Sequence, residues 1–406
     1  MKTKILNTNK FALSVLTAAI LSAPSAFAAD PAHGKSISDA LADSKVNISF
    51  RARYEAVDED GASGAADKDA DALTLKSRLT LNTGAYQGFS LGLEVDNVTA
   101  IVDDYNDAAG NNPTDSVIAD PEITDVNQAY IKYTNGDLKA TAGRQRILHN
   151  NQRFVGGVGW RQNEQTYDGV RIEYALNDAL SLDYSYIHNA NRIFADDAKS
   201  DLGGDFHFIN AAYKVNKAHK ITAFAYILDF DTAAALSTST YGALYNGKFD
   251  AVFVNASLAT QSDNGDNANS FDANYINAEI GSKLGKVTVL GGYELLGSDN
   301  GVGFSTPFAT LHKFQGWTDK FLGTPADGVQ DIYVTVKGAV AGVKLSATYH
   351  NLTSDANDID YGNELDLVAN YQVNKNYSLL AKFANYSADD YSTDTNKLWL
   401  QAVAKF

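Results

Sequence analysis

Basic residues occur at every second position in several short segments of the chain. Arginine and lysine side chains donate charge-assisted hydrogen bonds to carboxylates, so a row of them would guide or hold an anion. The residues assigned to such rows by their phase are Arg51, Arg53, Lys76, Arg78, Lys132 and Arg171. Acidic residues with the same phase, among them Glu94, Asp183, Glu294 and Asp366, predict a more acidic wall facing these rows. The alternative is that the charges pair across neighbouring strands and stiffen the wall.

Residues 147–165 form a segment rich in arginine, aromatic and amide side chains. Such groups bind sugar hydroxyls and carboxylates. We predict that this segment folds into the interior of the protein and narrows it. The side chains assigned to this constriction are Arg153, Phe154, Trp160, Arg161 and Glu164. A loop packed on its neighbours at the rim is the alternative.

Residues 297–327 form a long segment that is unusually apolar for a loop. Its side chains of interest are Phe304, Phe308, His312, Phe314 and Trp317. Apolar residues between Thr310 and Leu322 recur with the spacing of one helix face, which predicts a short helix there. We expect the segment to pack inside the mouth of the protein as a partial lid or plug. The alternative is a rim contact with lipopolysaccharide.

Catalytic and metal-binding signatures are missing from the sequence. Asp67, Asp69 and Asp71 resemble a fragment of a calcium loop, but the glycine and distal glutamate of that motif are absent. The chain contains no cysteine and no serine-hydrolase, zinc-protease or phosphate-loop motif. Its net charge of −16 argues against a nucleic-acid partner. We therefore predict no enzyme, no metal site and no cofactor.

The rows of charge lie within segments of period two, in which apolar and polar residues alternate. Val46–Glu55 and Leu73–Leu81 are clear examples. Alternation of this period indicates strands with one apolar and one polar face. About 18 such segments are predicted, starting near residues 45, 72, 88, 125, 137, 166, 179, 205, 219, 238, 250, 271, 285, 328, 341, 362, 376 and 396. The segment from 219 has mixed faces, and Arg144 and Arg146 fall on the apolar phase of theirs, which suggests a bulge or a misplaced strand end.

The connections between these segments alternate between short turns and long acidic loops. This alternation, together with aromatic-rich strands of modest hydropathy, is typical of outer-membrane β-barrels. No apolar stretch beyond the N-terminus is long enough for a membrane helix. We therefore predict an all-β transmembrane antiparallel barrel over residues 45–406, with its apolar face outward, its polar face inward and an interior wide enough for water. A soluble β-sandwich is the alternative.

Both ends of the chain carry further signals. Residues 1–28 have lysines, an apolar run and a small-residue end, which predict a signal peptide. Residues 29–44 are expected to form a short periplasmic segment. The last segment ends on Phe406 in phase with its apolar face, and resembles the signal by which the barrel-assembly machinery receives outer-membrane proteins.

The two unusual loops carry a family resemblance. The motifs GRQRI (143–147), NQRFVG (151–156) and GWRQNEQT (159–166), with YELLGSD (293–299), FSTP (304–307) and TLHKFQGW (310–317), resemble the alginate export family of outer-membrane porins. The resemblance implies an 18-stranded barrel with a basic, arginine-lined lumen that exports an anionic polysaccharide. The residues that match this lining are Arg144, Arg146, Arg153 and Arg161.

Taken together, these features predict a passive outer-membrane channel of a Gram-negative bacterium. The strongly acidic chain and its only half-basic predicted lumen argue against a dedicated polysaccharide exporter. We therefore expect a general or modestly anion-biased channel for small hydrophilic solutes. Membrane lipid, lipopolysaccharide and the barrel-assembly machinery are the other expected partners. An exporter of an anionic polysaccharide such as alginate and a structural or adhesive surface barrel are the alternatives.

Overall fold

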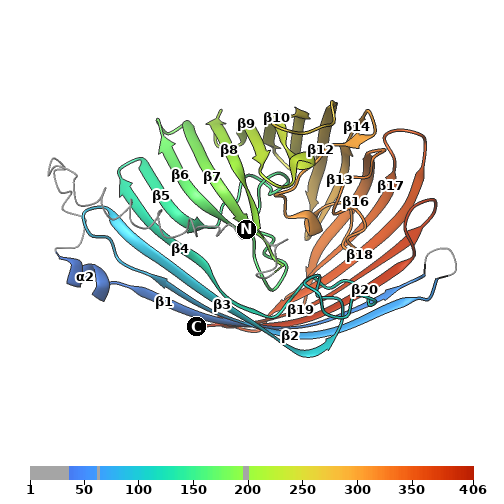
Figure 1. Ribbon diagram of the computed structural model, residues 1–406, viewed down its shortest axis with the longest axis horizontal. Coiled ribbons are helices and arrows are strands. Elements are labelled where there is room, and N and C mark those ends of the chain that lie inside the picture. Colours follow the sequence, from blue (N-terminus) through green and yellow to red (C-terminus); the bar gives the residue numbers. More distant parts are fainter. Residues whose placement is uncertain (1–35, 62–64, 195–200) are drawn as a thin grey trace, which may run out of the picture.

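The computed structural model describes residues 36–61, 65–194 and 201–406, which form an antiparallel barrel of 18 strands (Figure 1). The predicted signal peptide lies outside the described residues. The barrel strands are β1 (Lys45–Glu59), β2 (Lys68–Asn82), β3 (Phe89–Asp104), β4 (Ile123–Asn135), β5 (Leu138–Gln145), β6 (Thr166–Ala175), β7 (Leu180–Asn191), β8 (Asp201–Lys214), β9 (His219–Phe230), β10 (Thr238–Phe249), β11 (Val252–Asp263), β12 (Asp272–Leu284), β13 (Val287–Leu296), β16 (Val329–Val340), β17 (Val343–Thr353), β18 (Asp360–Gln372), β19 (Tyr377–Ala388) and β20 (Thr395–Lys405). Each predicted segment corresponds to one of these strands, with starts that agree within four residues.

Pairing between the first and last strands closes the barrel. β1 pairs with β2 on one side and with β20 on the other, where Arg53 lies opposite Gln401. Every other barrel strand pairs with its neighbours in the chain. The predicted fold class, a closed transmembrane-type barrel of about 18 strands, is confirmed.

The outer wall of the barrel is apolar. Leu91, Ile280, Val334 and Leu400 point outward with about half of each side chain exposed. Such a continuous apolar surface suits hydrocarbon, and closure leaves no strand edge that lipid would have to satisfy. Among the described residues, no helix is long and apolar enough to cross a membrane.

The inner wall is polar in most sectors but aromatic on β8 and β9. Phe206, Phe208, Phe224 and Tyr226 point inward and are almost fully buried. The expectation that polar residues line the whole interior is wrong in this sector. The mixed faces of the segment from residue 219 have a physical cause, because one apolar face of β9 meets lipid and the other packs against loops inside the barrel.

Few residues are helical. α2 (Ile37–Ala42) precedes β1, and η2 (Ala234–Leu236) precedes β10. The helix predicted between Thr310 and Leu322 is wrong. That region contains only the short turn η3 (Leu311–Lys313), after a small hairpin of β14 (Ser298–Asp299) and β15 (Val302–Gly303). Positive φ angles at Gln315, Gly316 and Asp319 interrupt any helix there.

The irregularity expected around Arg144 and Arg146 has a local explanation. β5 ends at Gln145, so Arg146 lies beyond the strand. Gly143 adopts a φ of +116°, and a Cβ at this position would lie 2.4 Å from the carbonyl oxygen of Ala129. The kink lets both arginines reach carboxylates on neighbouring segments.

Candidate functional site: two loops inside the barrel

Two loops fold into the barrel and hold each other there. We call residues 146–165 the inner loop and residues 297–328 the mouth loop. Val155 forms an isolated bridge with Phe308, and the Gly156 amide donates to the Phe308 carbonyl at 2.8 Å. Gly156 is required at this crossing, since a Cβ there would lie 2.3 Å from Thr310 Oγ1. The two loops therefore behave as one unit, in agreement with the inward folding predicted for each.

Aromatic packing fixes this unit to the wall formed by β8, β9 and β12. Phe308 of the mouth loop contacts the rings of Phe206, Phe208 and Phe230 at centroid distances of 5.0, 5.9 and 5.4 Å. Phe154 of the inner loop packs on Phe224, Tyr226, Tyr275 and Phe304. Burying one such ring stabilises the docked loop by about 1.5–3 kcal/mol. Phe154, Phe304 and Phe308 therefore anchor the two loops to the barrel wall.

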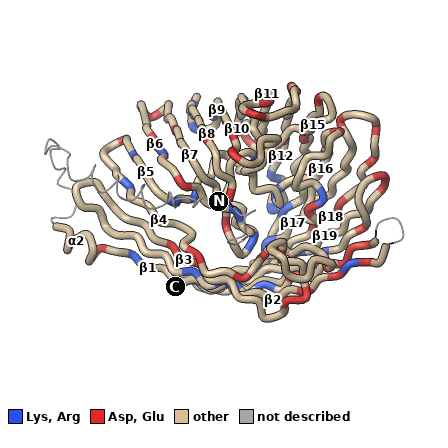
Figure 2. The backbone as a smooth tube through the Cα atoms, in the orientation of Figure 1, with Lys and Arg blue, Asp and Glu red and all other residues tan. Residues whose placement is uncertain are grey.

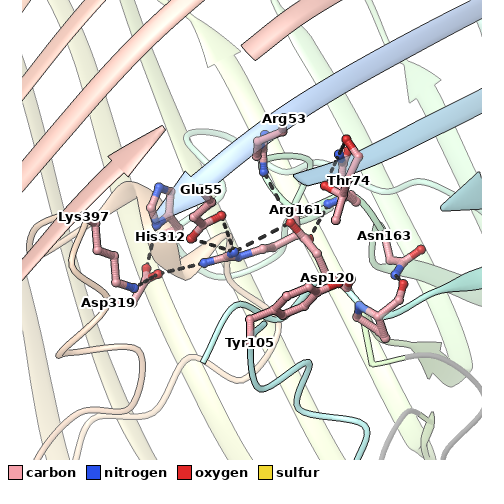
Figure 3. A network of polar contacts seen from close by, with 12 residues as sticks. Arg53, Glu55, Thr74, Tyr105, Asp120, Arg161, Asn163, His312, Asp319 and Lys397 are labelled. Atoms are coloured by element: carbon pink, nitrogen blue, oxygen red, sulfur yellow. Dashed lines mark hydrogen bonds and ion pairs between the residues drawn. The ribbon is translucent and has the colours of Figure 1, made fainter. Parts of the chain in front are cut away.

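Arg161 is the centre of the polar contacts that attach both loops to the opposite wall (Figure 3). Its guanidinium lies 3.0 Å from Glu55 of β1 and 3.1 Å from Asp319 of the mouth loop. Asp120, in the loop between β3 and β4, is 3.8 Å away. Burial alone would lower the pKa of Arg161, but these three carboxylates raise it above its usual value. One buried cation thus joins three segments that are far apart in the sequence.

Asp319 and His312 extend this network within the mouth loop. Asp319 accepts from Lys397 at 3.1 Å and contacts His312 Nδ1 at 2.6 Å. Burial would raise the pKa of Asp319, but the hydrogen bond from His312 and the positive charges of Lys397 and Arg161 hold it well below its usual range. Burial lowers the pKa of His312 to about 3, with Lys382 and Arg161 adding to the effect. His312 is therefore neutral at pH 7.

An aromatic cage surrounds Lys382 of β19. Its ammonium lies 4.1, 3.7 and 4.8 Å from the ring centroids of Trp160, Trp317 and Trp399, the three tryptophans of the chain. His312 Nε2 is 2.6 Å from the same ammonium. Lys382 was missed in the sequence analysis, although it lies on the inward phase of its strand. Trp160 and Trp317 thus serve to hold the loops against β19 and β20.

A second group of charges lies beside the inner loop, on β2, β3 and the end of β5. Glu164 of the inner loop is bound by Lys76 at 3.6 Å, by Arg78 at 3.0 Å and by Arg146. Burial would raise the pKa of Glu164, but these cations lower it to about 2. Arg78 also pairs with Asp96 of β3. We call Lys76, Arg78, Arg146, Glu164 and Asp96 the eyelet.

The remaining predicted basic residues are mostly paired as well. Arg51 donates to Gln162 and to inner-loop carbonyls, and Arg53 donates to Gln401. Arg144 pairs with Asp168, Arg153 with Glu294, and Arg171 with Asp183. Arg51 and Lys132 are the two of these predicted residues that form no ion pair with a described residue. Nearly every predicted cation thus meets a carboxylate, amide or carbonyl oxygen, which is the arrangement described by the alternative of paired inward charges.

The buried and water-exposed parts of the interior lie on different sides. Inward residues of β13, β16, β18 and β20, namely Glu294, Asp331, Glu364 and Trp399, are at most 2% exposed. On the eyelet side, the Arg78 and Arg146 side chains remain 16% and 25% exposed. The loops therefore bury the inner wall of β13, β16, β18 and β20, while Arg78 and Arg146 stay partly exposed beside the inner loop.

A cavity of about 580 Å³ lies between the mouth loop and its neighbours. Its lining combines apolar side chains such as Val57, Ala309 and Leu311 with Arg161, His312 and Asp319. Of the predicted mouth-loop residues, His312 lines this cavity. Phe304 and Phe308 are almost fully buried and do not line it, and Phe314 stacks on Arg153 at 4.6 Å. The acidic triplet belongs to the wall, where Tyr54 donates to Asp71 and the Gly61 amide to Asp67.

Comparison with known proteins agrees with this architecture. The chain resembles crystal structures of OccK9 (OpdG) from Pseudomonas aeruginosa (15% identity, TM-score 0.69, 90% of this chain and 100% of that one) and OpdK with vanillate from the same organism (14%, 0.69, 90% and 99%). It also resembles OccAB3 from Acinetobacter baumannii (16%, 0.66, 90% and 100%). At these identities the likeness shows the fold alone. No curated protein sequence matches the chain.

The sequence itself matches a family model. Residues 43–277, more than half of the chain, match the model described as alginate export. This region includes β1 to β11, the first half of β12, the eyelet and the whole inner loop. The resemblance noted at the inner-loop motifs is thus confirmed. The chain belongs to the alginate export family.

Proposed function

We propose that the protein is a passive channel for small hydrophilic solutes in the outer membrane of a Gram-negative bacterium. The observation that carries this proposal is the one-sided filling of the lumen. The loops bury one wall, while Arg78, Arg146 and Arg171 keep 16%, 25% and 17% of their side chains exposed on the other. Barrels of 16 to 18 strands are wide enough for an aqueous channel around such a constriction.

The chemistry of the open path favours small anions and dipolar solutes. Arg78 and Arg146 share Glu164 and Asp96, so the eyelet presents both donors and acceptors. Guanidinium groups bind carboxylates in a bidentate manner. The fold relatives are outer-membrane porins, and one of them was crystallised with vanillate, a small carboxylate. These points support a modest preference for carboxylate solutes.

The placement in the membrane rests on the apolar outer wall and on the turns. We assign the end with short turns to the periplasm and the end with long loops to the outside, where lipopolysaccharide would surround it. Phe406 supports the proposed role in assembly, since its backbone pairs with Ile48 of β1. Its ring is 59% exposed on the outer wall, where the barrel-assembly machinery could bind it.

Export of an anionic polysaccharide, the family's namesake activity, is the second candidate. The row of arginines from Arg51 to Arg171 favours it. The joined loops occupy part of the lumen, so this reading requires them to move aside for a polymer. Deletion of the gene without any change in secreted polymer would argue against it.

Planar-bilayer recording tests the channel directly. The purified protein should give discrete, ohmic conductance steps, and a protein that folds but never conducts would instead support a structural or adhesive barrel. The reversal potential in a salt gradient should shift toward cation selectivity in an Arg78→Ala, Arg146→Ala double variant. Lys68→Ala, which removes one exposed charge at the outer end of β2, is the control for each single variant, Arg78→Ala and Arg146→Ala, and should leave the potential unchanged.

A further inference from the structure

The short-turn end of the barrel carries lysines on the inward face of many strands. Residues directly opposite in an antiparallel ladder share a face, and faces alternate along each strand. Counting from inward residues such as Arg53, Tyr226 and Glu279, the inward lysines at this end are Lys45, Lys132, Lys139, Lys214, Lys220, Lys248, Lys283, Lys337, Lys344 and Lys405. We call these ten residues the lysine collar.

The collar lacks counter-charges. None of its side chains forms a hydrogen bond or an ion pair within the part of the chain that the structure describes, and most are exposed. The acidic residues nearby are either in turns, as Asp137, Asp178 and Asp250 are, or already bound. Glu173 lies opposite Lys139, but its carboxylate is held by Arg171 at 3.6 Å. The eyelet cations, in contrast, are neutralised.

Some collar lysines face one another directly. Lys214 lies opposite Lys220 across the β8–β9 ladder. Lys283 and Lys337 both lie opposite Thr288, which places them about 10 Å apart, two strand spacings. Like charges in such positions destabilise a sheet. An unpaired ring of this kind is the arrangement expected where an external anion supplies the missing charge.

The two ends of the barrel have opposite charge. Acidic segments gather at the end with the long loops, for example along the right-hand edge of Figure 2, where β1 meets β2. Asp58, Asp60, Asp103 and Asp104 belong to this end. A multivalent anion would be repelled there and attracted at the collar. Lipid headgroups are not suitable occupants, because the outward neighbours at the collar are apolar, among them Val46, Leu284 and Val340.

We propose that the lysine collar is a binding site for multivalent anions that enter the lumen from the short-turn end. Closely spaced phosphate or carboxylate groups, as in a polyphosphate or an oligouronate, match its chemistry. Phosphate and carboxylate groups would bridge collar lysines on adjacent strands and concentrate the anion before the eyelet. The entry of the anion into the lumen rests on the proposed channel function, whereas its binding to the collar lysines does not.

Side-specific block of single channels tests the proposal. A single Asn357→Cys substitution in the loop between β17 and β18, in a chain without cysteine, allows biotin labelling that reports the orientation of each inserted channel. Tripolyphosphate added to the short-turn side should block the current reversibly, less so at high salt. The same concentration on the long-loop side should have no effect. Equal block from both sides would overturn the proposal.

Matched triple variants locate the site. Replacement of Lys214, Lys283 and Lys337 by Gln should raise the half-blocking concentration about tenfold, equivalent to about 1.4 kcal/mol. Replacement of Lys217, Lys286 and Lys375, which lie in turns at the same end, removes the same charge and should change it little. An equal effect of both triples would assign the block to net charge alone and refute the collar.

Two further arms separate the possible causes. If both an oligouronate and tripolyphosphate block the current, the collar recognises closely spaced negative charges of either kind. If only tripolyphosphate blocks, the collar recognises phosphate. Gluconate carries a single charge and should not block. Titration calorimetry of tripolyphosphate with the protein in detergent measures binding without conduction. Loss of binding when Lys214, Lys283 and Lys337 are replaced by Gln supports the collar even if the protein does not conduct. Conduction without tripolyphosphate binding would refute the collar and leave the proposed channel intact.

Discussion

Removal of the Arg161 side chain should release the two loops from the barrel wall. Arg161→Ala leaves Glu55, Asp120 and Asp319 buried without their shared cation. Loss of one partner from a buried ion pair costs about 3–5 kcal/mol. The aromatic anchors around Phe308 are untouched, so the loss should fall on the docking of the loops and not on the strands.

Single-channel recording and limited proteolysis report this change. We expect a larger and noisier conductance, and faster cleavage within residues 146–165 and 297–328. Arg144→Ala is the control, because its pair with Asp168 is partly exposed and such pairs contribute about 0–1 kcal/mol. Unchanged conductance and protection in Arg161→Ala, with the barrel folded, would show that the buried network does not hold the loops.

The remaining predictions concern acid and packing. His312 has a folded pKa lowered to about 3, so docking of the mouth loop is fully stable only above the ordinary histidine pKa of about 6.5 and weakens as pH falls toward 3. By pH 4.5 the docking free energy of the mouth loop should fall by about 2–3 kcal/mol, which limited proteolysis would detect as faster cleavage of this loop. His312→Gln should flatten the pH dependence of cleavage between pH 6.5 and 4.5. An unaltered pH profile in this variant would show that His312 is not the titrating group. Glu164, with its pKa lowered to about 2, should lose its contribution only below its usual pKa of 4.5. Phe308→Ala should cost about 3–5 kcal/mol of docking and loosen both loops together, measured by hydrogen exchange; loosening of the mouth loop alone would show that the loops are not one unit.

Much of the barrel could be predicted because its signal is local. A strand that meets lipid on one face and polar groups on the other alternates with period two, and the turn chemistry between strands is readable residue by residue. β9 shows the limit of this signal. Phe224 and Tyr226 break the pattern because they pack against Phe154 of the inner loop, about 70 residues earlier in the chain.

The candidate site was predicted in outline. Composition alone indicated that residues 147–165 and 297–327 fold inward, and the phase of each strand placed most basic residues inside. The carboxylates that neutralise them could not be predicted, because Arg161 lies 106 residues from Glu55 and 158 from Asp319. Lys382 likewise acquires its role only when three distant tryptophans meet around it.

The sequence by itself determined the number of strands, their boundaries and the charge of each face, since these follow from alternation and turns within a few residues. Only the tertiary structure decided which charges remain available to a solute. Folding of the inner loop into the barrel brings Gln162 to Arg51, Glu164 to Arg78 and Glu55 to Arg161, and the lysine collar is left without partners among the described residues. Whether a cation is paired depends on its distance from an anion in space, which separation along the chain does not specify.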